Sequence, residues 1–213
     1  MTIQTGETGT TTSMRFGPLT IAYDDRVLEP RAWTTLQSHW ARELLGTAPA
    51  GAVLELCSGA GHIGLLAVDG TDRTLVCVDQ NPVACEFATR NARAAGRGDL
   101  VDVRNIALQS LAEDEAFPLI IADPPWVSSD DVHRFPEDPV LAIDGGSDGL
   151  ALARACVAVI DGHLHQRGAA LVQLGSTEQA RALADDLPSS LVLVEVREHP
   201  NGVVALLRRP GSH

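Results

Sequence analysis

The stretch LELCSGAGHIG, residues 54–64, decides the fold. Its first residues belong to GAVLELC (51–57), a continuous apolar run with one acid that is typical of a buried strand. Gly59 and Gly61 have no Cβ, so the backbone can turn sharply there and pass close to a ligand. The residues that follow, GHIGLLAV (61–68), predict a helix. A strand, a glycine turn and a helix in this order predict a ligand site beyond the carboxyl end of the strand.

Strands and helices alternate along the rest of the chain. Apolar runs predict strands over 73–79, 100–105, 117–123 and 169–175, and periodicity or capping residues predict helices over 31–46, 81–96, 148–163 and 176–187. Two apolar runs within 191–209, on either side of Asn201-Gly202, predict a C-terminal hairpin. We therefore expect an α/β fold with a seven-stranded, mostly parallel sheet, a C-terminal antiparallel hairpin, and helices on both faces.

The composition suits one globular domain. The chain has 213 residues, 45% of them hydrophobic, which is enough for one core of ordinary size. Residues 1–13, MTIQTGETGTTTS, are polar and lack the pattern of a signal peptide. We expect a disordered tail over 1–13 and a single domain over 14–213. No apolar run is long enough to cross a membrane, so no membrane association is expected.

The cysteines indicate the cellular compartment of the protein, and its net charge indicates the class of partner. Cys57, Cys77, Cys85 and Cys156 have neither disulfide nor zinc spacing, so we interpret them as core residues of a cytoplasmic protein. The histidines show no metal spacing either, and no metal site is predicted. The formal net charge of −12 disfavours a nucleic-acid partner, because phosphates need a basic surface. The sequence predicts no particular oligomeric state.

An acid at the end of the second strand adds to the glycine turn. Asp79 ends RTLVCVD (73–79), where its carboxylate can accept hydrogen bonds from both hydroxyls of a ribose. Glu55 lies in the first strand, where an acid disfavours a pyrophosphate and suits a cationic ligand. S-adenosylmethionine carries an ammonium and a sulfonium but no phosphate, so we predict this cofactor. The predicted binding residues are Glu55, Ser58, Gly59, Gly61, Asp79, Gln80 and Asn105. The alternative is a plain tight turn in which Asp79 only caps a helix.

Three motifs resemble those of class I S-adenosylmethionine-dependent methyltransferases: LELCSGAGHIG (54–64), VCVDQNP (76–82) and ADPPWV (122–127). Two flanking stretches, VLEPRAWT (27–34) and AIDGGSDGL (142–150), resemble the HemK/PrmC family of protein-glutamine methyltransferases. The resemblance covers roughly residues 15–209 and implies a Rossmann-like class I methyltransferase fold.

The resemblance also has consequences for single positions before and after the first strand. It implies that Thr34 closes over the cofactor and that Glu29 contacts the substrate. The chain departs from the family at Ile106 and Trp33, which stand where the family usually or often has an acid. Trp33 and Trp40 share a helical spacing, which favours a place in the core over a role in binding.

The box Asp123-Pro124-Pro125-Trp126 stands where the family usually has Asn-Pro-Pro-Tyr. The nitrogen of a planar amide or exocyclic amine must pyramidalise to accept a methyl group, so its N–H groups must be held by acceptors. We predict that the Asp123 carboxylate and the Pro124 carbonyl accept them, while Pro125 stiffens the turn and Trp126 stacks on the planar group. Catalytic roles therefore fall to Asp123, Pro124 and Trp126. The alternative is a rigid strand-end turn with Trp126 in the core.

Four functions remain open at this point. The resemblance favours methylation of a side-chain amide in a protein, namely a glutamine of a translation factor. The alternatives are an exocyclic amine of RNA or DNA adenine, an amine of a small molecule, and a catalytically idle fold that serves as a partner subunit. Four acids follow the box, where they would repel phosphates and could receive a basic peptide: Asp130, Asp131, Glu137 and Asp138. A protein or a small molecule is therefore the expected partner.

Overall fold

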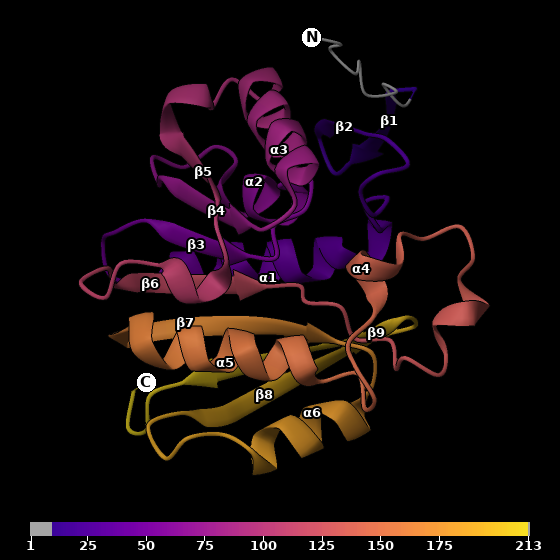
Figure 1. The fold of residues 1–213 in the computed structure, drawn as a ribbon. Coiled ribbons are helices and arrows are strands. Elements are labelled where there is room, and N and C mark those ends of the chain that lie inside the picture. Colours follow the sequence, from indigo (N-terminus) through magenta and orange to yellow (C-terminus); the bar gives the residue numbers. More distant parts are fainter. Residues whose placement is uncertain (1–9, 213) are drawn as a thin grey trace, which may run out of the picture.

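A seven-stranded sheet forms the centre of the protein (Figure 1). The computed structural model describes residues 10–212. The strands lie in the order β5-β4-β3-β6-β7-β9-β8, with bounds β3 Val53–Leu56, β4 Leu75–Asp79, β5 Val101–Asn105, β6 Phe117–Ala122, β7 Leu164–Leu174, β8 Val192–His199 and β9 Gly202–Arg208. Strands β3 to β7 run parallel, and β9 pairs antiparallel with both β7 and β8. The predicted parallel sheet with a C-terminal hairpin is confirmed.

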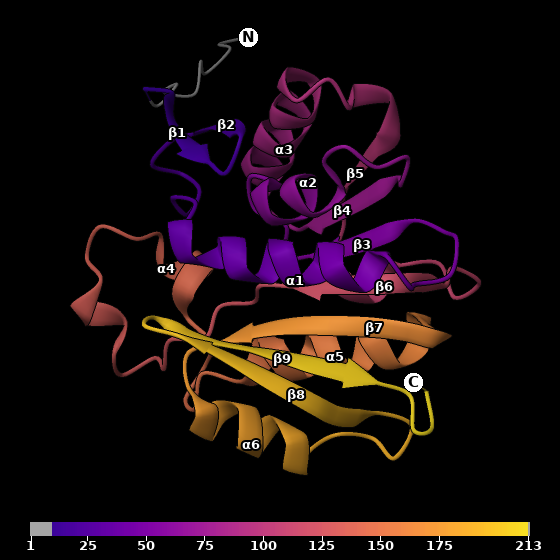
Figure 2. The same cartoon turned by 180° about the vertical axis from the view of Figure 1, so that it is seen from behind.

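Helices cover both faces of this sheet, as predicted. Helices α1 (Thr35–Leu45), α2 (His62–Val68) and α3 (Pro82–Ala94) pack on one face, and α5 (Ala151–His163) and α6 (Thr177–Asp185) pack on the other. Helix α5 lies in front of the sheet in Figure 1 and α1 lies in front of it in Figure 2. Neighbouring residues of a strand point to opposite faces. In β3, for example, Val53 packs with α1–α3 and Leu54 with α5 and α6.

Local sequence signals explain where two of the helices begin. The Asn81 side chain accepts a hydrogen bond from the Val83 N–H at 2.9 Å, and Pro82 occupies the first position of α3. Ser176 caps α6 in the same way, with Gln179 N–H donating to its hydroxyl at 3.2 Å. The shortest elements were not predicted because they hold too few residues for a periodic pattern: α4 Val140–Ile143 and the 3₁₀ turns Ala32–Thr34, Gly98–Leu100, Leu108–Ser110 and Val132–Arg134.

A separate N-terminal hairpin, β1 (Thr12–Phe16) with β2 (Leu19–Tyr23), packs against α2 and α3. The buried Phe16 ring meets the His62 ring edge-on, with 4.8 Å between the ring centroids. The buried Asn91 amide of α3 accepts from Ala22 N–H at 2.8 Å and donates to the Ala60 carbonyl at 2.9 Å. One amide therefore joins this hairpin to the glycine loop.

The predicted division of the chain stays a prediction. Residues 1–9 of the expected tail lie outside the described residues, and β1 begins at Thr12, inside the expected 1–13. Among residues 10–212, the helices are all too short or too polar to cross a bilayer. The four cysteines are free thiols, and Cys77, Cys85 and Cys156 are buried as expected.

Candidate active site

The glycine loop joins β3 to α2 at the carboxyl edge of the sheet. Gly59 and Gly61 both have left-handed φ angles, +51° and +75°, which glycine adopts at little cost. A Cβ on Gly61 would lie 3.2 Å from the Ala88 Cβ, so this glycine lets α2 pack against α3. A Cβ on Gly59 would meet nothing within 4 Å. Gly59 therefore borders open space, where a ligand can approach the backbone.

The two residues before Gly59 carry strain and an unsatisfied polar atom. Cys57 has a left-handed φ of 55°. Such a conformation costs a residue with a Cβ roughly 1–2 kcal/mol. Ser58 is buried, and within the described part of the chain its hydroxyl has no hydrogen-bond partner. Strain and unpaired buried groups concentrate at functional sites, so both features point to this loop.

Asp79 connects the end of β4 to the glycine loop. Its Oδ2 accepts from Gly59 N–H at 2.8 Å, and its Oδ1 accepts from Asn81 N–H at 2.8 Å. Burial raises the pKa of Asp79, and the hydrogen bonds to its carboxylate only partly offset that effect. Two neighbours complete this edge: Gln80 is exposed, and Asn105 donates from Nδ2 to the Asp79 carbonyl at 3.0 Å. Asp79 thus holds the glycine loop and the turn that follows β4, whereas Asn81 caps α3.

Glu55 is buried beneath α2 and does not reach the open side of the loop. Its Oε1 accepts from Gly64 N–H at 3.0 Å, and its Oε2 lies 3.5 Å from Cys77 Sγ. A Cβ on Gly64 would overlap Oε2, which explains the third glycine of LELCSGAGHIG. Burial, reinforced by the charges of Asp123 and Asp79, raises the pKa of Glu55 to about 8. The carboxyl is therefore mostly protonated at neutral pH and bound to α2, and its predicted contact with the cofactor stays a prediction.

The segment before α1 places Thr34 and Glu29 differently. Thr34 is buried, and its Oγ1 lies 3.4 Å from Nε2 of His62, the first residue of α2. Burial lowers the pKa of His62 to about 3, so this ring is neutral. Glu29 is exposed and accepts a hydrogen bond from the Tyr23 hydroxyl at 2.9 Å. The structure thus brings Thr34 to the start of α2, whereas Glu29 is held at the surface by the N-terminal hairpin.

Asp123 follows β6 directly, between the glycine loop and the rest of the box. Its N–H donates to the Leu56 carbonyl at the end of β3, at 3.4 Å. The side chain is half-buried, and burial alone raises its pKa to about 7. Among residues 10–212, neither the Asp123 carboxylate nor the Pro124 carbonyl takes part in a hydrogen bond. Both predicted acceptors are therefore unpaired, Asp123 on a half-buried side chain and Pro124 on a buried residue.

The backbone of the box is held by the stretch that contains Gly145 and Gly149. Val127 N–H donates to the Ile143 carbonyl at 3.0 Å, and Gly145 N–H donates to the Val127 carbonyl at 2.8 Å. A Cβ on Gly145 would lie 2.7 Å from the Pro125 carbonyl oxygen, and one on Gly149 would overlap the Trp126 carbonyl oxygen. These glycines are required because two backbones touch here, which gives AIDGGSDGL a physical role beside the box.

The side-chain amides of Gln37 and Gln179 bind backbone groups in or next to the box, and neither role was predicted from the sequence. Gln179 donates from Nε2 to the Trp126 carbonyl at 2.9 Å, and its Oε1 accepts from Gly175 N–H at 2.8 Å. Gln37 of α1 donates from Nε2 to the carbonyls of Ala122 and Leu171, at 3.0 and 3.2 Å. Gln179 carried a signal, because it stands three residues after Ser176, which is the spacing of a capping box. Gln37 carried none, because its partners are distant in sequence.

A groove of about 470 Å³ lies beside Trp126. Trp126 is half-buried, and a Cβ on Gly175 would overlap its ring, so the ring rests against the end of β7. Trp33 and Phe135 line the same groove. The expectation that Trp33 belongs to the core is wrong, because the 3₁₀ turn before α1 leaves it half-buried, whereas Trp40 is in the core as predicted.

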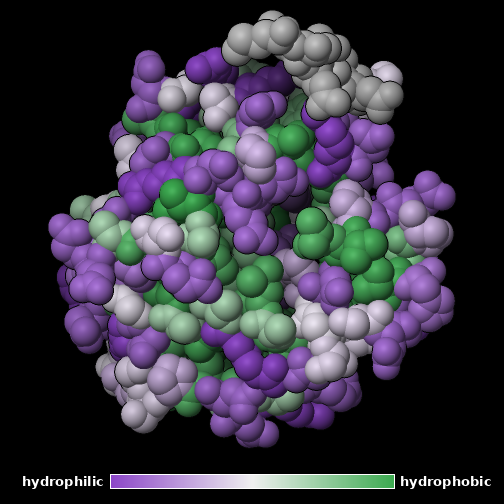
Figure 3. Space-filling view, viewed as in Figure 1, coloured by the Kyte–Doolittle hydropathy of each residue, from purple (hydrophilic) through white to green (hydrophobic). Residues whose placement is uncertain are grey.

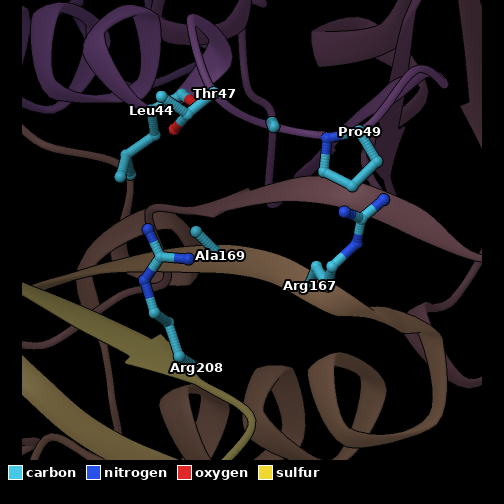
Figure 4. Close-up of a pocket in the computed structure, with 7 residues that line it drawn as sticks. Leu44, Thr47, Pro49, Arg167, Ala169 and Arg208 are labelled. Carbon is cyan, nitrogen blue, oxygen red and sulfur yellow. The ribbon is translucent and has the colours of Figure 1, made fainter. Parts of the chain in front are cut away.

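A second cavity lies at the other edge of the sheet (Figure 4). It measures about 120 Å³ and is lined by the last turn of α1 and the residues that follow it, by Arg167 and Ala169 of β7, and by Arg208 at the end of β9. Ligands of parallel sheets bind at the carboxyl ends of the strands, and this cavity lies at the amino ends. We therefore do not assign it to the active site.

Comparisons with known proteins agree with the geometry. The Methyltransferase small domain model matches residues 38–137. A ribosomal protein uL3 glutamine methyltransferase of Francisella tularensis is 26% identical over 181 residues, which cover 81% of this chain and 58% of that protein. The structure of the hMettl16 catalytic domain has a TM-score of 0.71 at 14% identity, over 90% of this chain and 74% of that chain. This last similarity supports the fold alone.

A longer match decides the family. A release factor glutamine methyltransferase of Deinococcus radiodurans is 31% identical over 198 residues, which cover 90% of this chain and 69% of that protein. The chain spans only 58% of the Francisella relative's length, so whatever the rest of that protein contributes lies outside the match. On this similarity and on the motifs that surround its glycine loop, the chain belongs to the HemK/PrmC-like family of class I methyltransferases.

Proposed function

We propose that this protein is an S-adenosylmethionine-dependent N-methyltransferase that methylates a glutamine side chain in a protein of the translation machinery. The observation that carries the proposal is the pair of free acceptors at the end of β6. The half-buried Asp123 carboxylate and the Pro124 carbonyl have no partner among the described residues, and Asp123 N–H binds the end of β3 beside the glycine loop. A side-chain amide has two N–H groups, which match two acceptors.

The residues of this edge fit S-adenosylmethionine. Gly59 leaves the loop backbone open, the buried Ser58 hydroxyl lacks a partner among the described residues, and the Asp79 carboxylate lies beside Gly59, where we expect it to bind the ribose. Asp79 and Asp123 have pKa values raised by burial, and within residues 10–212 neither forms an ion pair with arginine. A ligand with positive charge would relieve the cost of ionising them. When bound, this cofactor supplies an electrophilic methyl carbon.

The residues of the box then position the acceptor nitrogen. The Asp123 carboxylate and the Pro124 carbonyl accept the two N–H groups of the amide, which lets its nitrogen pyramidalise toward the methyl group. An N–H donor favours the ionised form of Asp123, so substrate binding lowers the pKa of a carboxyl that burial holds at about 7. The Trp126 ring, which rests against Gly175, stacks on the planar amide. Holding the reacting atoms in this way is the main contribution that a protein makes to methyl transfer.

The choice of a protein substrate rests on the relatives. The proteins from Francisella tularensis and Deinococcus radiodurans are named as glutamine methyltransferases of ribosomal protein uL3 and of release factor. The net charge of −12 opposes nucleic acid. Such a substrate, together with the four free thiols, supports a cytoplasmic location.

Transfer of labelled methyl groups into a cell lysate tests the proposal. We expect the label in the protein fraction and, by mass spectrometry, on glutamine. Asp123→Ala should lower turnover by about 100-fold or more while S-adenosylmethionine affinity, measured by calorimetry, stays the same. Asp123→Asn keeps one acceptor oxygen and should retain substantial activity on an amide.

Three results would count against the proposal. Label in nucleic acid or in small molecules would place the acceptor in another class, and absence of transfer from the unmodified protein would indicate an idle fold. Full activity of Asp123→Ala would show that the box is only a structural turn.

A further inference from the structure

We propose that the groove beside Trp126 binds an arginine or lysine side chain of the protein substrate, a few residues from the methylated glutamine. The groove measures about 470 Å³, within the usual range of ligand sites, about 300–1,000 Å³. This inference rests on the proposed function, which places the glutamine at Asp123. The groove adds a second site at which the protein recognises the same substrate.

The position of the groove follows from the order of the strands. Strand β6, which ends at Asp123, lies between β3 and β7. The glycine loop and Asp79 lie on the β3 side. The groove lies on the other side, lined by Gly175 after β7, by the start of α6 and by the turn between β8 and β9. A substrate with its glutamine at Asp123 that extends away from the cofactor passes toward the β7 side, where the groove lies.

The lining of the groove is complementary to a cation. Three aromatic rings line it, those of Trp33, Trp126 and Phe135, and the faces of such rings attract an ammonium or guanidinium group. Two carboxylates also line it, those of Glu178 and Glu198, whereas no lysine or arginine does.

The two carboxylates come from different elements and are held in different ways. Hydrogen bonds from its own backbone N–H and from Ser176 keep the pKa of Glu178 below its usual value, so this side chain is ionised. Glu198 Oε1 accepts from the Thr177 hydroxyl at 3.0 Å, which joins the hairpin to the start of α6.

These acids differ from the ones that follow the box in sequence. Asp131 pairs with Arg134, and Asp138 pairs with Arg31, so arginines neutralise half of the four acids in 130–138. Glu178 and Glu198 have no such partner among the described residues. Each of the two sets therefore keeps two acids without an ion-pair partner, and only those of the groove lie beside the three aromatic rings.

The surface around the groove favours a peptide over a free small cation. Leu141 and Val140 of α4 are 91% and 55% exposed, and Phe135 in the groove wall is 39% exposed. Figure 3 shows apolar side chains gathered over the part of the surface where α4 lies in Figure 1. Exposed apolar groups beside a charged groove are typical of a surface that receives another protein.

The distance along the chain limits where the cation lies in the substrate. Trp126 is three residues after Asp123, which corresponds to at most about 11 Å of extended chain. An extended substrate covers the same distance in about three residues. Because the groove lies on one side of Asp123 only, the cation should be preferred about three or four residues from the glutamine, and in one direction only.

A set of labelled nonapeptides tests this inference. Each peptide has a central glutamine in a glycine–serine background, with one arginine placed in turn at every other position. Binding is measured by fluorescence anisotropy in the presence of S-adenosylhomocysteine, and methyl transfer is measured separately. We expect about tenfold tighter binding for arginine at one or two positions on one side, from a cation–π contact together with an ion pair.

Two double variants test whether the acids of the groove, and not other acids nearby, cause the arginine preference. Glu178→Gln with Glu198→Gln should remove most of the tenfold preference and leave S-adenosylmethionine affinity unchanged. Asp130→Asn with Glu137→Gln removes two exposed acids that do not line the groove, and it should leave the preference intact.

The two readouts separate this inference from the proposed function. Glutamine methylation without any arginine preference would contradict cation binding in the groove and leave the proposed function intact. A preference that depends on Glu178 and Glu198, without methylation of any peptide, would support the groove and count against glutamine as the acceptor. Three further results would contradict cation binding in the groove. These are equal preference on both sides of the glutamine, no peptide binding at all, and competition by a short RNA.

Discussion

Replacing Glu55 by glutamine should make the stability of the protein fall less steeply as the pH rises. Burial raises the pKa of Glu55 from 4.5 to about 8 in the folded protein. Below pH 4.5 the carboxyl is protonated in the folded and the unfolded chain, so its protonation costs no stability there. Between pH 4.5 and 8 the unfolded chain ionises while the folded chain stays protonated, so the free energy of unfolding falls.

The size of the effect follows from this shift. The pKa rises from 4.5 to about 8, a difference of about 3.5, and each unit corresponds to about 1.4 kcal/mol, which gives an upper limit of about 5 kcal/mol. Glutamine has nearly the same shape, does not titrate, and can still accept from Gly64 N–H. The carboxyls of Asp79 and Asp123 are present in both proteins, so their own burial cancels in the comparison and only their charge coupling to Glu55 remains.

Urea unfolding, followed by tryptophan fluorescence at constant ionic strength from about pH 5 to about pH 8.5, measures the effect. We expect the stability of Glu55→Gln relative to the unmodified protein to increase by several kcal/mol across this range. The exposed Glu113 provides the matched control, since Glu113→Gln should follow the unmodified protein at every pH. Curves for Glu55→Gln and the unmodified protein that stay parallel would refute the reasoning, whatever their constant offset.

Two further predictions concern glycine-dependent geometry. Cys57→Gly should be about 1 kcal/mol more stable than Cys57→Ala in urea unfolding, because both lose the thiol but only alanine keeps a Cβ at a φ of 55°; equal stability would show that this backbone relaxes freely. Gly175→Ala would place a Cβ in the Trp126 ring and 2.9 Å from Gln179 Oε1, so the ring must move. We expect kcat/KM for methyl transfer to fall by up to about 100-fold, with cofactor affinity unchanged in calorimetry. An unaltered kcat/KM would show that the ring position does not matter for transfer.

The fold could be predicted from the sequence because each strand of the seven-stranded sheet and each of the longer helices carried a local signal. Apolar runs that alternate with helical patterns predicted all seven strands of the sheet. The capping residues Asn81 and Ser176, with Pro82, predicted where α3 and α6 begin. Strand β7 begins at Leu164, five residues before the predicted start at Ala169, because LHQRG has no apolar run. The pairing of β1 with β2 was missed because its stability depends on contacts with α2 and α3.

The site was predictable where its residues follow strand ends and not where contacts between distant segments decide their environment. Asp79 and Asp123 lie at the carboxyl edge because parallel strands end there. Glu55 was expected to face the ligand, but its direction depends on the face of β3 from which it projects and on the space that Gly64 leaves. Gln37 and Gln179 bind backbone groups far away in sequence, which no local pattern reveals.

The way in which the Asp-Pro-Pro-Trp turn is anchored has a consequence for how its chemistry can change. Its anchors are backbone groups: Asp123 N–H, the Trp126 carbonyl, and both polar groups of Val127. The side chains at 123 and 126 contribute no anchoring bond among the described residues, so either can be exchanged without rebuilding the turn. Gly145, Gly149 and Gly175 have no such freedom, because a Cβ at each would collide with the turn or the ring. New acceptor preferences can therefore arise by single substitutions at two positions on an unaltered scaffold, and an aspartate with a tryptophan in place of the family's asparagine and tyrosine is one such exchange.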